Sequence, residues 1–151
     1  MNHDYKSILE QSNLLVILDK AGTIKYVNDK FCNTSTFRYD ELIGRKYIDF
    51  IPKKIRNSEE KIYQEVIGII DIKEKEIGEI MDTLNRKENW RGIIKNKGKI
   101  GNTFWTSTII IPILDFDGNI NEFYLVQTDI TDLEIAKNSN RIIEITNNGI
   151  L

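Results

Sequence analysis

Residues 89–105, NWRGIIKNKGKIGNTFW, contain both tryptophans of the chain, Trp90 and Trp105. The glycines at 98 and 101 predict a tight turn, and the runs on either side of them predict two extended strands. Trp90 and Asn96 lie six residues apart, so the strand period of two places their side chains on one face. The two indoles therefore either fill a core or help to wall a pocket.

Further strands are predicted on both sides of this stretch. The run NEFYLVQTDIT at 121–131 follows the turn Asp117-Gly118, which is a strong hairpin signal. Upstream, LLVILDKAGTIKYVN at 14–28 predicts two strands around Gly22. The order of two strands, several helices and three strands predicts an α+β fold, with a five-stranded antiparallel sheet and the helices on one face.

Helices are expected at five places, one of which is a short helix at RYDELIG that ends at Gly44. Residues 1–12 predict a short entry helix, and Asn28 is a good N-cap for a helix beginning DKFCN. Residues 52–89 predict an extended helical segment, because two apolar stripes recur at helical spacing. Those stripes are Ile62, Val66, Ile69 and Ile70, then Ile77, Ile80, Met81 and Leu84. Residues 132–151 predict a C-terminal connector helix, for which Thr131 and Glu134 suggest a capping box.

The bulk composition excludes several classes of protein. The chain has 151 residues, 40% of them hydrophobic, which suits one domain with a real core. A net charge of −2 argues against nucleic-acid binding and gives no support for direct membrane contact. No apolar run reaches the length of about 18 residues that a membrane span requires. The single cysteine and the polar N-terminus predict a cytoplasmic protein.

The inventory of reactive side chains argues against an enzyme or a metal site. His3 is the only histidine, and it lies near the terminus. Cys32 has no histidine to activate it and is expected to be an inert core thiol. Paired carboxylates lie at predicted helix starts, where they favour the helix dipole. The domain is therefore not expected to be catalytic.

The chain resembles a PAS domain over residues 13–132. The resemblance is carried by LDKAGTIKYVNDKFCNTSTFRYDELIG at 18–44 and by the segment from 89 to 131. It implies a PAS domain at 13–131 with the connector helix at 132–151 leading to an output domain. Asp129 and Thr131 fall in a segment similar to the exit motif of the family, which implies that they couple the core to the output.

Within that family, the pattern W-x-G-x-x-x-N…G-x-x-F-W is similar to the FAD-binding PAS domains of aerotaxis receptors. The residues that match it are Trp90, Gly92, Asn96, Gly101, Phe104 and Trp105. By this resemblance FAD is the implied cofactor, with Asn28, Trp90, Asn96 and Trp105 as cofactor-binding residues. Light-sensing flavin domains have a cysteine where this chain has Tyr47, and oxygen-sensing heme domains need a helix histidine, which is missing.

The expected function is that of a cytoplasmic sensory module. A bound ligand or flavin would shift the sheet between two arrangements, and the hypothesis is that rotation of the Asn96 amide passes the change to the exit helix. A ligand-free dimerisation module is the alternative, because the exit helix has a weak heptad seam that favours a homodimer. A linked histidine kinase, cyclic-di-GMP enzyme or chemoreceptor output all fit this reading.

Overall fold

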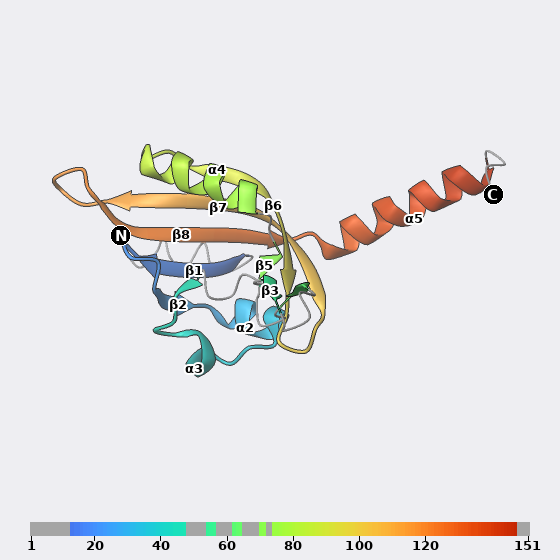
Figure 1. Cartoon of the computed structure of the whole chain (residues 1–151), viewed down its shortest axis with the longest axis horizontal. Helices are drawn as coiled ribbons and strands as arrows, with labels where there is room; N and C mark the ends of the chain where they lie inside the picture. Colours follow the sequence, from blue (N-terminus) through green and yellow to red (C-terminus); the bar gives the residue numbers. More distant parts are fainter. Residues whose placement is uncertain (1–12, 48–53, 57–61, 65–69, 72–73, 148–151) are drawn as a thin grey trace.

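The computed structural model describes residues 13–47, 54–56, 62–64, 70–71 and 74–147. Its centre is an antiparallel sheet in the order β2-β1-β8-β7-β6-β5 (Figure 1). The strands of this sheet are β1 (Leu14–Asp19), β2 (Ile24–Val27), β5 (Ile70–Asp71), β6 (Trp90–Lys97), β7 (Thr103–Leu114) and β8 (Ile120–Asp129). The five predicted strands are thus confirmed, and β5 adds a short sixth strand at the edge beside β6.

Local sequence explains why these strands form where they do. β7 alternates buried and less buried positions along its length, as a strand with one face on the core should. The hairpins β1–β2 and β7–β8 turn at Gly22 and Gly118, which have φ values of 85° and 80°. Glycine adopts this left-handed conformation without the steric cost of a side chain.

Three helices cover one face of the sheet. α2 (Asp29–Ser35) and α3 (Tyr39–Leu42) lie along β1 and β2, and α4 (Glu74–Asn85) lies along β6 and β7 (Figure 1). Each contributes a residue to one continuous core together with the inner face of the sheet. The buried members of that core are Leu14, Val16, Leu18, Ile24, Val27, Phe31, Leu42, Tyr47, Leu84, Ile94, Phe104, Ile110 and Leu125. The predicted α+β layout with helices on one face is confirmed.

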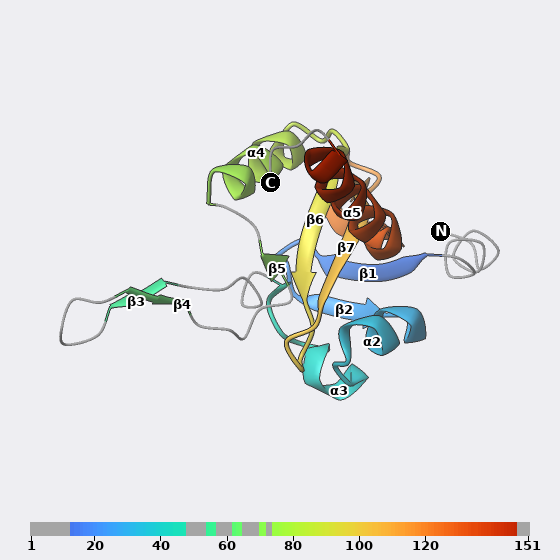
Figure 2. The same ribbon diagram turned by 90° about the vertical axis from the view of Figure 1, so that its right-hand side faces the viewer.

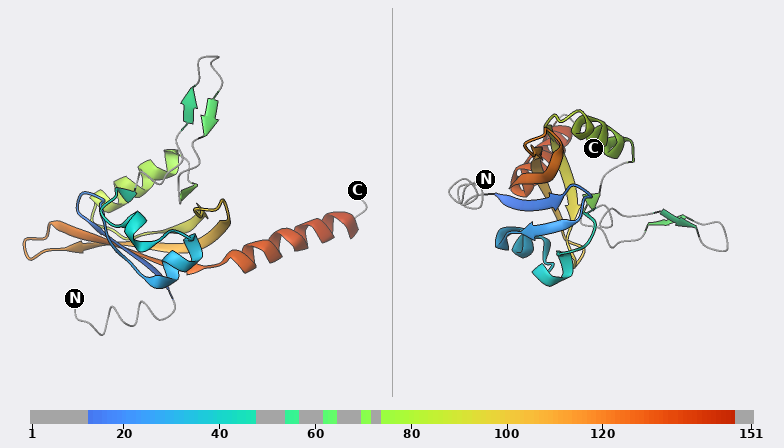
Figure 3. Two further views of the ribbon diagram at one scale, coloured as in Figure 1. Left: turned by 90° about the horizontal axis from the view of Figure 1, so that it is seen from below. Right: turned by 90° about the vertical axis from the view of Figure 1, so that its left-hand side faces the viewer.

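The predicted helical segment 52–89 is wrong over much of its described length. Among the residues of this segment that the structure describes, α4 alone is helical, whereas β3 (Lys54–Arg56), β4 (Ile62–Gln64) and β5 are strands. β3 and β4 pair as a separate two-stranded ribbon, which lies apart from the main sheet in Figures 2 and 3. The reason is that short runs rich in β-branched residues fit a strand as well as a helix, and periodicity alone does not separate them.

The exit helix α5 (Thr131–Asn147) follows β8 directly and extends away from the sheet (Figures 1 and 3). Its first turn contacts β7. Leu133 and Ile135 on this helix are 54% and 56% exposed. The predicted entry helix at 1–12 lies outside the described residues.

Candidate ligand-binding site

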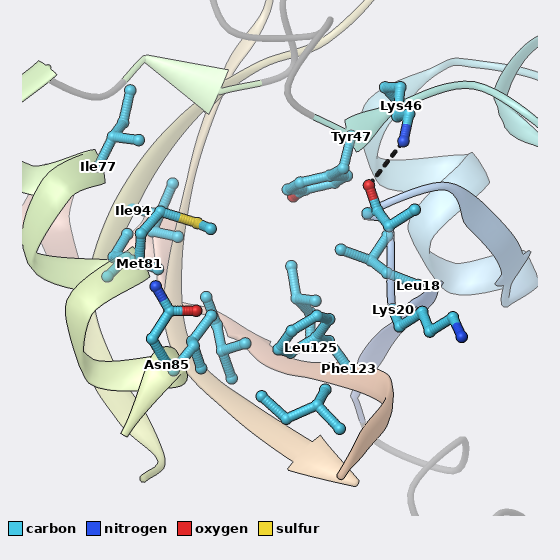
Figure 4. Close-up of a pocket in the computed structure, with 16 residues that line it drawn as sticks. Leu18, Lys20, Lys46, Tyr47, Ile77, Met81, Asn85, Ile94, Phe123 and Leu125 are labelled. Carbon is cyan, nitrogen blue, oxygen red and sulfur yellow. Dashed lines mark hydrogen bonds between the residues drawn. The ribbon is translucent and has the colours of Figure 1, made fainter. Parts of the chain in front are cut away.

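A cavity of about 420 Å³ lies between the inner face of the sheet and α4 (Figure 4). Its volume falls within the range of pockets that hold small organic ligands. The walls are mostly aliphatic, and they come from α4, from the inner faces of four strands and from the β1–β2 turn. The lining residues are Leu18, Lys20, Ala21, Gly22, Lys46, Tyr47, Ile77, Ile80, Met81, Leu84, Asn85, Ile94, Ile110, Ile120, Phe123 and Leu125.

Two sequence features build this cavity. The second predicted apolar stripe, from Ile77 to Leu84, forms the face of α4 that is turned to the sheet, so the helix predicted from its spacing is confirmed. On the strands, Ile94, Ile110 and Leu125 occupy inward positions of the period-two alternation.

A group of four buried polar residues continues the same inner face beyond the cavity wall: Asn96, Thr106, Thr108 and Gln127, which we call the polar quartet. Asn96 and Gln127 each follow a lining residue, Ile94 or Leu125, by two positions. Each member of the quartet is at most 1% exposed. The quartet is therefore a polar extension of the apolar cavity.

Hydrogen bonds fix the orientation of the quartet. Asn96 Nδ2 donates to the carbonyls of Ile94 and Phe104 at 3.1 and 3.2 Å and to Thr106 Oγ1 at 3.0 Å. Thr106 Oγ1 donates to Gln127 Oε1 at 2.8 Å and lies 3.0 Å from Thr108 Oγ1. One network thus joins the side chains of β6, β7 and β8.

Three buried polar atoms around this network have no hydrogen-bond partner in the described structure: Asn96 Oδ1, Gln127 Nε2 and the Tyr47 hydroxyl. Burial raises the pKa of Tyr47, and hydrogen bonding with the Gln127 side chain opposes that shift, so these two groups face each other although they do not meet the full geometry of a hydrogen bond. The hydroxyl is therefore neutral at physiological pH and able to donate a hydrogen bond. A buried unpaired polar group costs about 1–3 kcal/mol, so a water or ligand that paired with these atoms would be stabilised there.

The predicted cofactor residues do not all meet at this cavity. Asn96 belongs to the quartet beside it. Asn28 is instead the N-cap of α2, as the sequence predicts, because its Oδ1 accepts the N–H groups of Phe31 and Leu15 at 3.0 and 3.1 Å. Its Nδ2 donates to the Asn13 carbonyl at 2.8 Å, and Asn28 is not among the lining residues.

The two tryptophans lie in different environments. The Trp90 indole is on the inner face, packed against the core and over Gly92, where an added Cβ would lie 2.5 Å from Trp90 Cη2. Trp105 follows Phe104 and so points to the opposite face, where Lys95 Nζ lies 5.5 Å from the centre of its ring. Neither indole belongs to the residues that line the cavity.

The predicted signal-coupling residues form a compact junction at the start of α5. Asp129 Oδ1 accepts the N–H of Thr131 at 3.0 Å and also its hydroxyl. Trp105 donates its backbone N–H to Thr131 Oγ1 at 3.0 Å and accepts the N–H of Ile130 at 2.8 Å. Asp129, rather than Glu134, therefore holds the N–H of Thr131, and β7 is bonded to the first turn of the exit helix.

Sequence reasoning missed Gln127, Thr106, Thr108 and the role of Tyr47. The strands themselves offered a signal for the first three, because each lies two residues from an inward-facing apolar residue such as Leu125. Tyr47 follows a loop, and no periodicity predicts where its ring points.

The described residues include neither a candidate metal site nor a candidate membrane-spanning helix. No group of three or more His, Cys, Asp or Glu side chains is placed to hold a metal ion in the part of the chain that the structure describes. No helix in that same part is long and apolar enough to cross a membrane.

Comparison with known proteins agrees with this architecture. The PAS domain family matches residues 12–132. The aerotaxis receptor of Escherichia coli K12 is 25% identical over 129 residues, which are 85% of this chain and 22% of that receptor. The nitrogen fixation regulatory protein of Klebsiella pneumoniae is 23% identical over 128 residues, 83% of this chain and 22% of that protein. The chain thus spans about a fifth of these curated relatives.

Solved structures show the same fold. A light-oxygen-voltage domain studied with a flavin analogue superposes with a TM-score of 0.65 at 24% identity, over 95% of this chain and 98% of that one. An RNA-binding light-oxygen-voltage receptor gives a TM-score of 0.66 at 14% identity, over 97% of this chain and 37% of that one. With the family match over residues 12–132, the sheet order and the helices on one face, the chain belongs to the PAS domain family.

Proposed function

We propose that this PAS domain is the sensory module of a longer, cytoplasmic signalling protein. It binds a small ligand, FAD by its resemblance, in the cavity and beside the polar quartet, and it signals through α5. The observation that carries the proposal is the set of three unpaired buried atoms, Asn96 Oδ1, Gln127 Nε2 and the Tyr47 hydroxyl, next to an aliphatic cavity. An apolar cavity with a few convergent polar groups is typical of small-ligand sites.

The donors and acceptors fit a flavin. Asn96 Oδ1 accepts a hydrogen bond, whereas Gln127 Nε2 and the Tyr47 hydroxyl donate one. The imide edge of a flavin ring offers an N–H between two carbonyls, which is the complementary set. Bound FAD would supply a redox-dependent change in the hydrogen-bonding pattern of its ring.

The quartet favours Gln127 over Asn96 as the amide that responds to the ligand. Two of the acceptors of Asn96 Nδ2 are backbone carbonyls, which only accept, so rotating this amide would lose those bonds. Gln127 Oε1 instead accepts from Thr106, whose hydroxyl can also accept a hydrogen bond. Rotation of the Gln127 amide therefore costs little, and it would reverse the direction of the hydrogen bond between Thr106 and Gln127.

The route from Thr106 to the exit helix is short. Thr106 is adjacent to Trp105, and the backbone of Trp105 is bonded to both Ile130 and Thr131. A change in the hydrogen bonds of Thr106 would thus act on the residue that holds the first turn of α5.

The proposal is tested by purifying the domain, recording its visible absorption spectrum and attempting reconstitution with FAD. We expect a flavin spectrum that is weakened in Asn96→Ala while denaturation shows that variant to be folded. A colourless protein that cannot be reconstituted would contradict the flavin assignment.

A second candidate, the ligand-free dimerisation module, is favoured by one observation. α5 stands clear of the sheet with Leu133 and Ile135 more than half exposed. A lone helix of this length is marginal in water and gains stability by packing against a second copy. If this candidate is correct, Asn96→Ala leaves self-association unchanged and no ligand copurifies.

A further inference from the structure

The charged residues that line the cavity share one sign. Among the residues that the structure describes, Lys20 and Lys46 are the charged members of the lining, and none of its members there is an aspartate or glutamate. The remaining polar side chains in the lining are Tyr47 and Asn85, and the Asn85 amide points into the cavity (Figure 4). The described part of this mostly aliphatic lining thus carries two cations.

Both cations belong to the solvent-facing rim. Lys20 lies in the β1–β2 turn, and Lys46 Nζ donates to the carbonyl of Ala21 in the same turn at 2.7 Å (Figure 4). Both residues are exposed, whereas Tyr47, next in sequence to Lys46, is buried. The cavity therefore has an inner end at Tyr47 and the polar quartet, and a cationic outer end at the turn.

The Asp19 carboxylate lies beside the same turn, but its hydrogen bonds are to its own backbone segment. The Asp19 carboxylate accepts the backbone N–H groups of Ala21 and Thr23, both at 2.9 Å, so it is directed into its own turn. Hydrogen bonds from Thr23 and Ala21 keep the pKa of Asp19 below its ordinary value, with Lys46 and Lys25 adding to that effect. Lys20 has no such neighbour among the interactions described for this turn.

We propose that the cavity selects an amphiphile with an anionic group. Its apolar or flat body lies against the aliphatic walls, and its phosphate or carboxylate lies between Lys20 and Lys46 at the rim. This inference rests on the proposed ligand-binding function and names the chemical class of the ligand. An uncharged ligand of the same body would leave the rim cations without a partner.

The expected preference is modest, because the rim is solvated. Exposed ion pairs contribute about 0.2–1 kcal/mol each. Two of them give a preference of about tenfold for the anionic member of a matched ligand pair. Salt weakens such contacts, so the preference should shrink as ionic strength rises.

The experiment uses ligand-free protein and two matched pairs, because an anion on an apolar body has two common sources. FMN against riboflavin tests a phosphorylated flavin, and dodecanoate against dodecanol tests a fatty acid. We expect the anionic member of at least one pair to bind about tenfold more tightly in wild type at low salt. The pair that shows the preference identifies the chemical class of the ligand, either a phosphorylated flavin or a fatty acid.

Substitutions distinguish the effect of the two rim lysines from a general effect of removing positive charge. The double variant Lys20→Gln, Lys46→Gln should lose the preference while its affinity for the uncharged member stays the same. Lys97→Gln, on the opposite face of β6, should keep the preference. Salt titration of wild type provides the same test without any substitution.

The outcomes distinguish the two proposals. Binding of anionic and uncharged members with equal affinity, or a preference that survives the double variant, overturns the anionic rim and leaves the sensory module in place. Failure of all four compounds and of FAD to bind overturns both.

Discussion

Trp105 and Thr131 are joined by a hydrogen bond of 3.0 Å from the backbone N–H of the tryptophan to the threonine Oγ1. The neighbours of Trp105 on β7, Phe104 and Thr106, are both bonded to Asn96 in the polar quartet. The residue predicted as a cofactor contact thus lies between the quartet and the exit helix. Its backbone, and not its indole, makes the connection.

Thr131→Val should loosen this junction without changing the cavity. Valine keeps the shape of threonine but removes the acceptor for Trp105 and the hydroxyl donor to Asp129. A loss of about 1 kcal/mol is expected locally, which lowers the hydrogen-exchange protection of the Trp105 and Ile130 amides about fivefold. Thr103→Val, at an exposed position of β7, is the matched control. If the hydrogen-exchange protection of these amides is unchanged in Thr131→Val, the bond does not stabilise the junction.

Gly92→Ala should displace the Trp90 indole. The added Cβ would lie 2.5 Å from Trp90 Cη2, a distance that real contacts do not reach, so the ring must move. We expect a loss of about 1–3 kcal/mol in the free energy of unfolding and a shifted Trp90 emission spectrum, recorded in a Trp105→Phe background. Gly78→Ala, in α4 with open space around it, should instead raise stability by about 0.5–1 kcal/mol. Identical emission in both alanine variants would mean that Gly92 does not constrain the indole.

The sequence was informative where structure is set locally. The strands β1, β2 and β6–β8 follow from alternation and from turn residues such as Gly118, and Asn28 was correctly recognised as an N-cap. The roles of Asn28 and Trp105 in the site were harder to predict, because a resemblance transfers residue identities but not side-chain directions. The contribution of Tyr47 and Gln127 depends on two distant segments meeting in the core, which no local pattern encodes.

Asp19 should make the stability of the β1–β2 turn depend on pH on the acid side. Its pKa is lowered by hydrogen bonds to its carboxylate from the backbone of Thr23 and Ala21, partly offset by burial. A lowered folded-state pKa gives stability that is present above the unfolded value of about 3.9 and is lost as pH falls through the folded value. In urea titrations, the free energy of unfolding of wild type at pH 7 should exceed that of Asp19→Asn by less than about 1 kcal/mol, and this difference should shrink steadily as pH falls below the unfolded pKa. A difference that does not shrink as the solution is acidified would contradict the electrostatic origin.

Gln127→Leu should weaken ligand binding while it leaves the free energy of unfolding nearly unchanged. The wild-type side chain buries an unpaired Nε2, and Thr106, which would lose its Gln127 acceptor, has Thr108 Oγ1 at 3.0 Å as an alternative. Removal of the unpaired Nε2 offsets the loss of the bonds that Thr106 and Thr108 donate to Gln127 Oε1, so the free energy of unfolding of the ligand-free domain should change by less than about 1 kcal/mol. Affinity for FAD should nevertheless fall at least about tenfold, because a buried hydrogen bond to the ligand is lost. Thr128→Val, at an exposed position of the same strand, should change neither quantity appreciably. A strongly destabilised Gln127→Leu domain with unchanged FAD affinity would make Gln127 a purely structural residue.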